Sequence, residues 1–168
     1  MLIKTLIKRL KMLLKNKSIY NDISEYSVGG AIPIVKKFEG CELKAYQCSA
    51  GVWTIGYGHT WGIKSTDTIT QEQAETYLVG DLMAFKHKLM PLVSVKITEN
   101  QFFALIDFIY NLGEGNFSSS TLRKKLNKGD FLGAAEEFPK WCRCKGEILN
   151  GLKKRREFER ELFLKDLK

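Results

Sequence analysis

Three residues whose side chains can carry out acid–base or nucleophilic chemistry follow one another early in the chain. Glu39, Cys48 and Thr54 form the pattern E-x8-C-x5-T, which combines a carboxylate, a thiol and a hydroxyl. Cleavage of a glycosidic bond needs one group that protonates the leaving oxygen and a second that directs water or attacks the sugar from the other face. Glu39 has the chemistry of the proton donor and Cys48 that of the second group. We expect the Thr54 hydroxyl to hold the attacking water.

The thiol of Cys48 leaves the stereochemistry of such a reaction open. A thiol has a pKa of about 8.5, so at neutral pH it offers less negative charge to an oxocarbenium-like transition state than a carboxylate does. Once deprotonated, it is a good nucleophile. A base that steers water would invert the sugar configuration, whereas a nucleophile would retain it. A third interpretation is that Cys48 is a small buried hydrophobic residue.

Short elements must position these groups. The apolar pattern over residues 32–38 predicts a helix that Gly40 ends, which places Glu39 at the negative end of the helix dipole. A carboxyl group that acts as an acid there also needs surroundings that withdraw it from water. Residues 51–60 are rich in glycine, aromatic and β-branched side chains, so they predict a small hairpin or meander that carries Thr54.

The rest of the chain is predicted to be helical. Two capping boxes, Thr70 with Gln73 and Thr98 with Gln101, predict the starts of two long helices, and Pro91 and Gly113 predict their ends. The first of these helices is expected to run from the Thr70 capping box to Leu89, and the second over Phe102 to Leu112. Three further helices are expected from Leu122 to Leu126, from Asp130 toward Phe138, and from about Leu152 to Leu167. The sequence therefore predicts an α+β fold that is mostly helical.

The active-site pattern and its context resemble the phage-type lysozymes, the endolysins of glycoside hydrolase family 24. The E-x8-C-x5-T pattern runs into Thr54-Ile55-Gly56-Tyr57-Gly58-His59, and the resemblance covers about residues 31–165. Most members of that family would have Asp in place of Cys48. Further resembling segments are Asn111 to Phe117, Ser120 to Asn127, Glu137 to Trp141 and Gly151 to Glu157.

The resemblance implies a two-lobed lysozyme-like fold. A small β-hairpin or meander would lie in an N-terminal lobe of about residues 31–90, and helices would form a C-terminal lobe of about residues 91–168. The glycan would occupy a cleft between the lobes, with Tyr57 and Asn111 as candidate contacts. Alternatively, Tyr57 belongs to the core and Asn111 ends its helix. His59 is expected to make a structural hydrogen bond.

The implied reaction is hydrolysis of the β-1,4 bond between N-acetylmuramic acid and N-acetylglucosamine in peptidoglycan by a bacteriolytic, monomeric muramidase. Glu39 would be the acid, Cys48 the base or nucleophile, and Thr54 the residue that positions water, with no metal and no organic cofactor. The alternative is a cationic membrane-active or peptidoglycan-binding protein whose lysozyme-like domain is inert. We expect synthesis in the host cytoplasm and action on the cell wall, in the periplasm or from outside.

The net charge of +8 is distributed unevenly. Residues 1–20 carry six basic side chains and no acid, residues 21–122 seven basic and eleven acidic, and residues 123–168 fourteen basic and eight acidic. Such a charge distribution favours binding to polyanions, and the bacterial cell envelope is the polyanion that we expect as the partner. Nucleic acid is not expected, because no zinc-finger, RNP or helix-turn-helix signature accompanies the charge. The basic run over residues 153–156 is expected to be a solvated helix face.

The N-terminal segment, residues 1–17, is predicted to be a cationic amphipathic helix. At 100° per residue its aliphatic side chains fall within an arc of roughly 140°, with lysines opposite. Its apolar runs are shorter than the ~18 residues that a membrane span needs, so a helix lying in an anionic membrane surface is one interpretation. Packing on the enzyme, or a disordered tail, is the other. Residues 16–30 are predicted to link this segment to a domain at 31–168.

Overall fold

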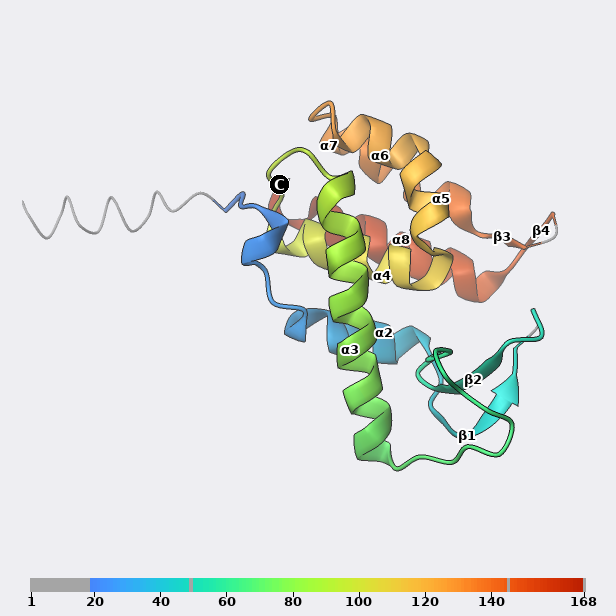
Figure 1. Cartoon of the computed structure of the whole chain (residues 1–168). Coiled ribbons are helices and arrows are strands. Elements are labelled where there is room, and N and C mark those ends of the chain that lie inside the picture. The colour runs from blue at the N-terminus through green and yellow to red at the C-terminus, as the bar shows by residue number, and fades with distance from the viewer. Residues whose placement is uncertain (1–18, 49, 145, 168) are drawn as a thin grey trace, which may run out of the picture.

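The computed structural model describes residues 19–48, 50–144 and 146–167, which form a small sheet lobe and a larger helical lobe (Figure 1). The long helix α3 (Gln71–Leu89) runs from the sheet at one end to the helical lobe at the other. It begins at the predicted capping box, because the Thr70 hydroxyl accepts the Gln73 N–H at 3.2 Å and the Gln73 side chain accepts the Thr70 N–H at 2.8 Å. The predicted α+β, mostly helical fold is confirmed.

The sheet lobe consists of a two-stranded antiparallel hairpin and the short helix in front of it. Helix α2 (Ile32–Phe38) is followed by β1 (Glu42–Gln47) and β2 (Trp53–Gly56). Tyr46 pairs with Thr54 across the hairpin. The first strand therefore precedes the segment 51–60 from which the hairpin was expected. After β2 the chain turns sharply, with Gly56 and Gly58 at φ angles of 62° and 103°, which side chains with a Cβ rarely adopt.

The helical lobe is built around α4 (Glu99–Leu112), which begins at the predicted capping box of Thr98 and ends at Gly113. Gly113 has a φ of 82°, as a glycine that ends a helix commonly does. Helix α8 (Asn150–Leu164) packs along α4, and the remaining helices surround the pair. Those helices are α5 (Glu114–Ser119), α6 (Thr121–Leu126) and α7 (Phe131–Ala135). A second hairpin, β3 (Arg143–Cys144) with β4 (Glu147–Ile148), leads into α8.

Short 3₁₀ helices complete the described chain. They span Ile23–Glu25, Gly29–Ala31, Met90–Leu92, Phe138–Trp141 and Lys165–Leu167. Neither α5 nor the second hairpin was predicted, because each is only a few residues long and lacks a hydrophobic period of its own.

The predicted linker is wrong for the part of it that the structure describes. Ile23, Tyr26 and Val28 are buried in the hydrophobic core. The Tyr26 hydroxyl donates to the Ile97 carbonyl at 2.6 Å, and the backbone of Asn21 pairs with that of Ile97. The folded unit thus begins at or before Asn21 rather than at residue 31. The proposed amphipathic helix of residues 1–17 lies outside the described residues.

No helix in the described part of the chain is both long and apolar enough to cross a membrane.

Candidate active site

Glu39 stands at the end of α2, where its backbone N–H still donates to the Val35 carbonyl at 2.9 Å. Its side chain is 26% exposed, so one side of the carboxylate faces solvent and the other faces protein. An acid at this place needs surroundings that withdraw it from water, and the apolar Phe38 precedes it. The structure adds a cation, because Arg155 Nη1 donates to Glu39 Oε1 at 2.5 Å.

The hairpin holds Cys48 and Thr54 next to each other. Cys48 follows β1, and its N–H donates to the Val52 carbonyl at 3.0 Å, while Thr54 is buried on β2. Hydrogen bonds from the backbone N–H groups of Ala50 and Val52 lower the pKa of the Cys48 thiol, and the nearby Thr54 hydroxyl lowers it further. The single hydrogen of that hydroxyl has two acceptors in reach, the sulfur and the Val52 carbonyl at 3.0 Å. The thiol and the hydroxyl of the E-x8-C-x5-T pattern therefore lie within reach of each other.

Tyr46 connects this hairpin with Glu39. Burial raises the pKa of the Tyr46 phenol, and so do the negative charges of Glu39 and Cys48, in that order. Both groups therefore lie within electrostatic range of one side chain, although they come from different elements. The carboxylate at the end of α2 and the thiol at the end of β1 thus border the same region.

A buried ion pair that the sequence did not reveal holds Glu39 in place. Arg155 is 4% exposed at its side chain and donates its Nε and Nη2 to the two carboxylate oxygens of Asp107, at 2.9 and 2.8 Å. Its remaining nitrogen reaches Glu39. Asp107 itself is fully buried on α4. A lone acidic residue inside the apolar stretch of α4 is the signal that could have revealed this pair.

The basic run at residues 153–156 is therefore not a solvated helix face as predicted. Lys153 and Lys154 are exposed, but Arg155 and Arg156 are buried. The Arg156 guanidinium donates to Glu159 at 2.7 Å and to the Asn111 side-chain oxygen at 3.0 Å. The two arginines point into the protein because α8 packs against α4, which supplies the hydrogen-bond acceptors Asp107 and Asn111.

Removal of the Asp107 charge should destabilise the fold. In Asp107→Asn the Arg155 guanidinium stays buried without its bidentate partner, and breaking such a buried pair costs about 3–5 kcal/mol of unfolding free energy. We expect a loss of about 3 kcal/mol, near the lower limit, because Glu39 remains in contact with Arg155. Urea denaturation followed by circular dichroism measures it.

The control for this prediction is the exposed ion pair between Lys36 and Glu75, at 2.5 Å. Glu75→Gln should leave the urea midpoint almost unchanged, because exposed ion pairs contribute little to stability. Equal urea midpoints for Asp107→Asn and Glu75→Gln would show that the buried pair does not stabilise the fold.

Asn111 lies beside Glu39, whereas Tyr57 is mostly core. Asn111 and Glu39 line a hollow of about 550 Å³ together with Leu149, which precedes α8, and Leu152 in its first turn. The helix continues past Asn111 to Leu112, so Asn111 does not end it. Tyr57 is 8% exposed, and its hydroxyl accepts a hydrogen bond from Gln71 at 2.8 Å. A role for either residue as a substrate contact remains a prediction, and the surroundings of Asn111 favour it more.

His59 makes the structural hydrogen bond that the sequence predicted. Its Nδ1 lies 2.9 Å from both carboxylate oxygens of Asp81 on α3, and its ring stacks on Tyr77 with centroids 4.5 Å apart. Burial raises the pKa of Asp81, and the bond to His59 partly offsets that rise. The pair fastens the loop after β2 to α3 and so fixes the end of the hairpin that carries Thr54.

Comparison with known proteins places this chain and its fold in one family. The family described as phage lysozyme matches residues 36–159. The endolysin of Acyrthosiphon pisum secondary endosymbiont phage 1 is 46% identical over 134 residues, which cover 77% of this chain and 92% of that protein. Two Bacillus phage endolysins that it also matches, of phages B103 and PZA, are longer, and the chain covers 52% of each.

Solved structures agree with the sequence relatives. The muramidase domain of SpmX from Asticaccaulis excentricus superposes with a TM-score of 0.76 at 34% identity, covering 81% of this chain and 95% of that one. An endolysin from the Escherichia coli phage FAHEc1 gives a TM-score of 0.74 at 37% identity, with 84% and 96% covered. The site residues 39–155 lie within the matched range, so by sequence and by fold the chain belongs to the phage lysozyme family.

Proposed function

We propose that this protein is an N-acetylmuramidase that hydrolyses the β-1,4 bond between N-acetylmuramic acid and N-acetylglucosamine. Membership of the phage lysozyme family makes it a bacteriolytic endolysin that degrades peptidoglycan. The observation that supports the finer assignment is the placement of Glu39 against Arg155 with Cys48 and Thr54 on the neighbouring hairpin. Two groups that can act on opposite faces of a sugar are what this hydrolysis requires.

Glu39 is the proposed general acid. Its carboxyl group is held by Arg155, is partly exposed, and lines the hollow that it shares with Asn111. A proton delivered from that position to the glycosidic oxygen lets the leaving sugar depart as an alcohol. Arg155 is a positioning residue, since its guanidinium is tied to Asp107 and fixes the direction of the carboxylate.

Cys48 is the proposed second group, acting as base or as nucleophile. The hydrogen bonds that lower its pKa enlarge the thiolate fraction at neutral pH, which serves either role. As a base it would take a proton from water that the Thr54 hydroxyl holds. As a nucleophile it would form a bond to the anomeric carbon, which water then cleaves.

The experiment that tests the proposal compares the intact protein with Glu39→Gln on purified peptidoglycan, with the new reducing ends identified by mass spectrometry. New ends that carry N-acetylmuramic acid, formed by the intact protein and not by the variant, support the proposal. New ends that carry N-acetylglucosamine would contradict it, because they arise from the other glycosidic bond.

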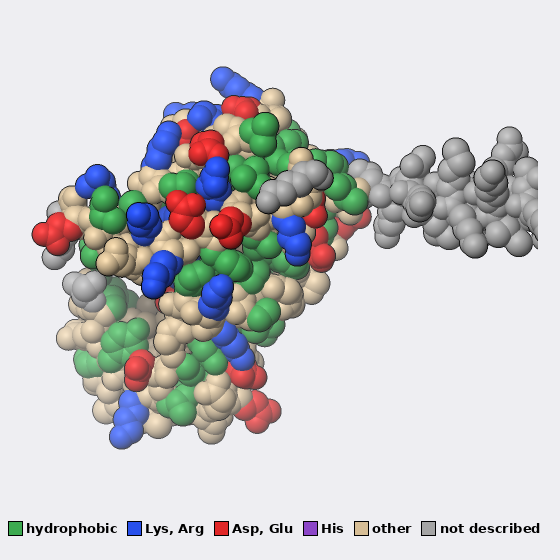
Figure 2. Space-filling model, turned by 180° about the vertical axis from the view of Figure 1, so that it is seen from behind, with side chains coloured by type: hydrophobic (Ala, Val, Ile, Leu, Met, Phe, Trp, Pro, Cys, Tyr) green, Lys and Arg blue, Asp and Glu red, His purple; other side chains and the backbone are tan. Residues whose placement is uncertain are grey.

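The N-terminal segment is proposed to direct the enzyme to an anionic membrane surface. Figure 2 shows that, on the face of the described domain seen from behind, Lys and Arg side chains alternate with Asp and Glu, so this face does not present a field of one sign. Residues 1–18 contain six basic and no acidic side chains. Attraction to anionic lipid is therefore assigned to this segment rather than to that face.

Deletion of residues 1–18 should separate catalysis from envelope access. The deletion ends at residue 18 because the Ile19 carbonyl and the Asn21 backbone form hydrogen bonds with the folded domain. Cleavage of purified peptidoglycan should stay close to that of the full chain, whereas binding to anionic vesicles should fall, most clearly at low salt. Co-sedimentation with anionic and neutral vesicles measures the binding. Unchanged vesicle binding would refute the membrane role, and a collapse of both stability and cleavage would show that the segment packs on the enzyme.

A further inference from the structure

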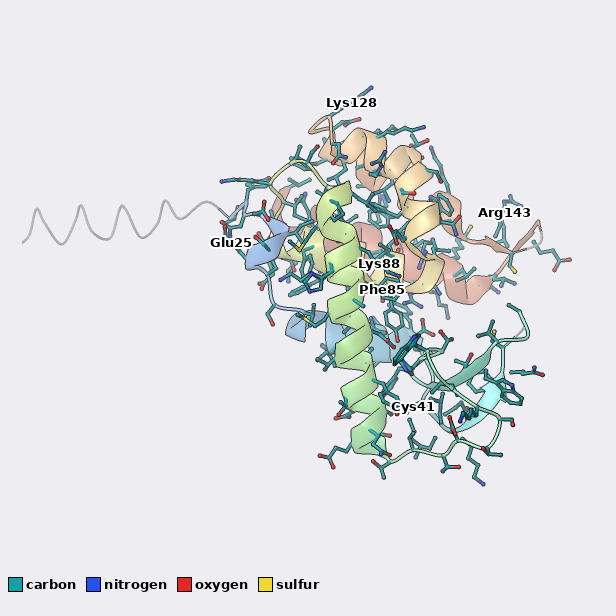
Figure 3. The ribbon with its side chains drawn as sticks, in the orientation of Figure 1. Glu25, Cys41, Phe85, Lys88, Lys128 and Arg143 are labelled. Atoms are coloured by element: carbon teal, nitrogen blue, oxygen red, sulfur yellow. The ribbon has the colours of Figure 1, made fainter. Side chains whose placement is uncertain are left out.

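A second hollow, of about 740 Å³, opens between the loop that follows β2 and the side of α3. Its rim on the loop is formed by Gly58, His59, Thr60 and Trp61, and Tyr110 from the end of α4 contributes to it. Phe85 and Lys88, both on the half of α3 nearest the helical lobe, complete its other end (Figure 3). The hydrogen bond of His59 to Asp81 holds the loop in place, but it does not explain why the hollow is open.

Trp61 is the most unusual residue of this hollow, because it is 86% exposed. An indole ring left in water forgoes the large gain that burial of an aromatic side chain brings. The loop that carries it is nevertheless well held, since the Trp61 carbonyl lies 3.1 Å from His59 Nε2 and His59 is bound to Asp81. A rigid loop that presents a free aromatic face is a preorganised binding surface.

The α3 side of the hollow leaves room for a flat ligand. Gly80 and Ala84 lie between the larger side chains of Tyr77 and Lys88, and a Cβ placed on Gly80 would meet no atom within 4 Å. A glycine inside an exposed helix costs about 1 kcal/mol relative to alanine, so helix stability does not favour it there. The open space at Gly80 lies in the hollow that Trp61 borders.

The charges at the hollow favour a neutral ligand. The Asp81 carboxylate is paired with His59, and the amino group of Lys88 lies 5.2 Å from the centre of the Phe85 ring. An anionic wall polymer or lipid headgroup would need several convergent cations, which these residues do not supply. Aromatic faces with a few polar groups match the alternating apolar and hydroxyl-bearing surfaces of an uncharged sugar.

Two segments of the chain link the residues of this hollow to those of the candidate active site. Thr54 and the rim of the hollow belong to one short stretch, β2 and the turn after it. Tyr110, whose hydroxyl donates to the Tyr57 carbonyl at 2.7 Å, is followed directly by Asn111, which shares a hollow with Glu39. Burial and the negative charges of Asp81 and Glu39 raise the pKa of Tyr110, so its phenol lies within electrostatic range of both carboxylates.

We propose that Trp61 stacks on an uncharged N-acetylglucosamine ring of the glycan strand at a distance from the bond that is cleaved, and thereby sets the preference of the enzyme for long strands. This inference rests on the proposed muramidase function. Binding energy gained away from the reacting centre positions the substrate at that centre. Trp61 is a specificity residue in this assignment and takes no part in proton transfer.

The test uses the full chain with Trp61→Ala, Trp61→Phe and, as a matched control, Leu132→Ala. Leu132 is 66% exposed on α7 and outside both hollows. For glycan strands of graded length freed of stem peptides, Trp61→Ala should raise KM for long strands roughly 5- to 30-fold, as loss of an aromatic anchor does. It should leave KM for the shortest cleavable strands unchanged, because these do not reach the indole. Trp61→Phe should have a KM for long strands close to that of the parent, and Leu132→Ala should have the same KM as the parent.

A second measurement reports on stacking directly. In a Glu39→Gln background, which binds strands without cutting them, long strands should shift the tryptophan emission to shorter wavelength, and Trp61→Phe should remove that shift. Equal KM values for Trp61→Ala and the parent on long strands, with no emission shift, would overturn the inference while leaving the muramidase assignment intact. An intact protein that releases no N-acetylmuramic acid ends would instead contradict the proposed function itself.

Discussion

Glu39→Gln should abolish the clearing of outer-membrane-stripped cells and the release of reducing ends from purified peptidoglycan. The amide keeps the shape of the side chain and can still contact Arg155, but it cannot donate a proton to the glycosidic oxygen. General acid catalysis contributes about 100- to 10,000-fold, so we expect a loss within that range. Initial rates of turbidity decrease at matched protein concentration measure it.

A matched control for this variant is Glu42→Gln. Glu42 is also a carboxylate of the sheet lobe, at the start of β1, but it is exposed and makes no ion pair with Arg155 among the described contacts. Its replacement should leave the rate within a factor of about two, since surface substitutions rarely matter. Activity of folded Glu39→Gln close to that of Glu42→Gln would refute the acid role.

Loss of the Cys48 thiol should lower the rate of cleavage about as much as Glu39→Gln does. Cys48→Ala removes both the base and the nucleophile, so the rate should fall about 100-fold or more. Cys48→Asp supplies a carboxylate that is ionised at neutral pH and should retain activity within about tenfold of the parent. The reducing-end assay measures both variants, and full activity of Cys48→Ala would show that the thiol only fills space.

Alkylation separates the chemistry of Cys48 from that of the other thiols. Iodoacetamide should inactivate the enzyme, and it should still do so in Cys41→Ala, which removes another free, half-buried cysteine of the sheet lobe. Because hydrogen bonds lower the pKa of Cys48, its thiolate forms at lower pH than that of an ordinary cysteine. The midpoint of inactivation rate against pH should therefore lie below the value measured for an unstructured cysteine peptide in the same assay. A midpoint above that value would contradict the hydrogen-bond arrangement at the end of β1.

Local features of this chain were predictable where neighbouring residues alone decide them. The capping boxes at Thr70 and Thr98 satisfy backbone groups within one turn, so their sequence predicts the starts of α3 and α4 directly. Gly113 likewise ends α4, because its positive φ is accessible to glycine. The hairpin was predicted only in part, since β1 carries exposed residues on most of its length and lacks a clear alternation.

Long-range contacts decided the features that the sequence analysis missed or misjudged. Polar composition over residues 16–30 predicted a linker, but Tyr26 packs on Phe102, far away in the sequence, with ring centroids 5.4 Å apart. A run of four basic residues predicted a solvated face, but α8 lies against α4, so Asp107 and Glu159 compensate the burial of Arg155 and Arg156.

The sequence by itself determined which groups are the candidates for the chemistry, because E-x8-C-x5-T fixes their types and order along the chain. It also determined the helix that ends just before Glu39 and the helices that are capped by Thr70 and Thr98. Only the tertiary structure decided what surrounds those groups. Arg155 follows Glu39 by 116 residues, and Trp61 borders a hollow because α3 passes beside its loop. Burial and charge pairing depend on which segments pack together, and local sequence does not specify that packing.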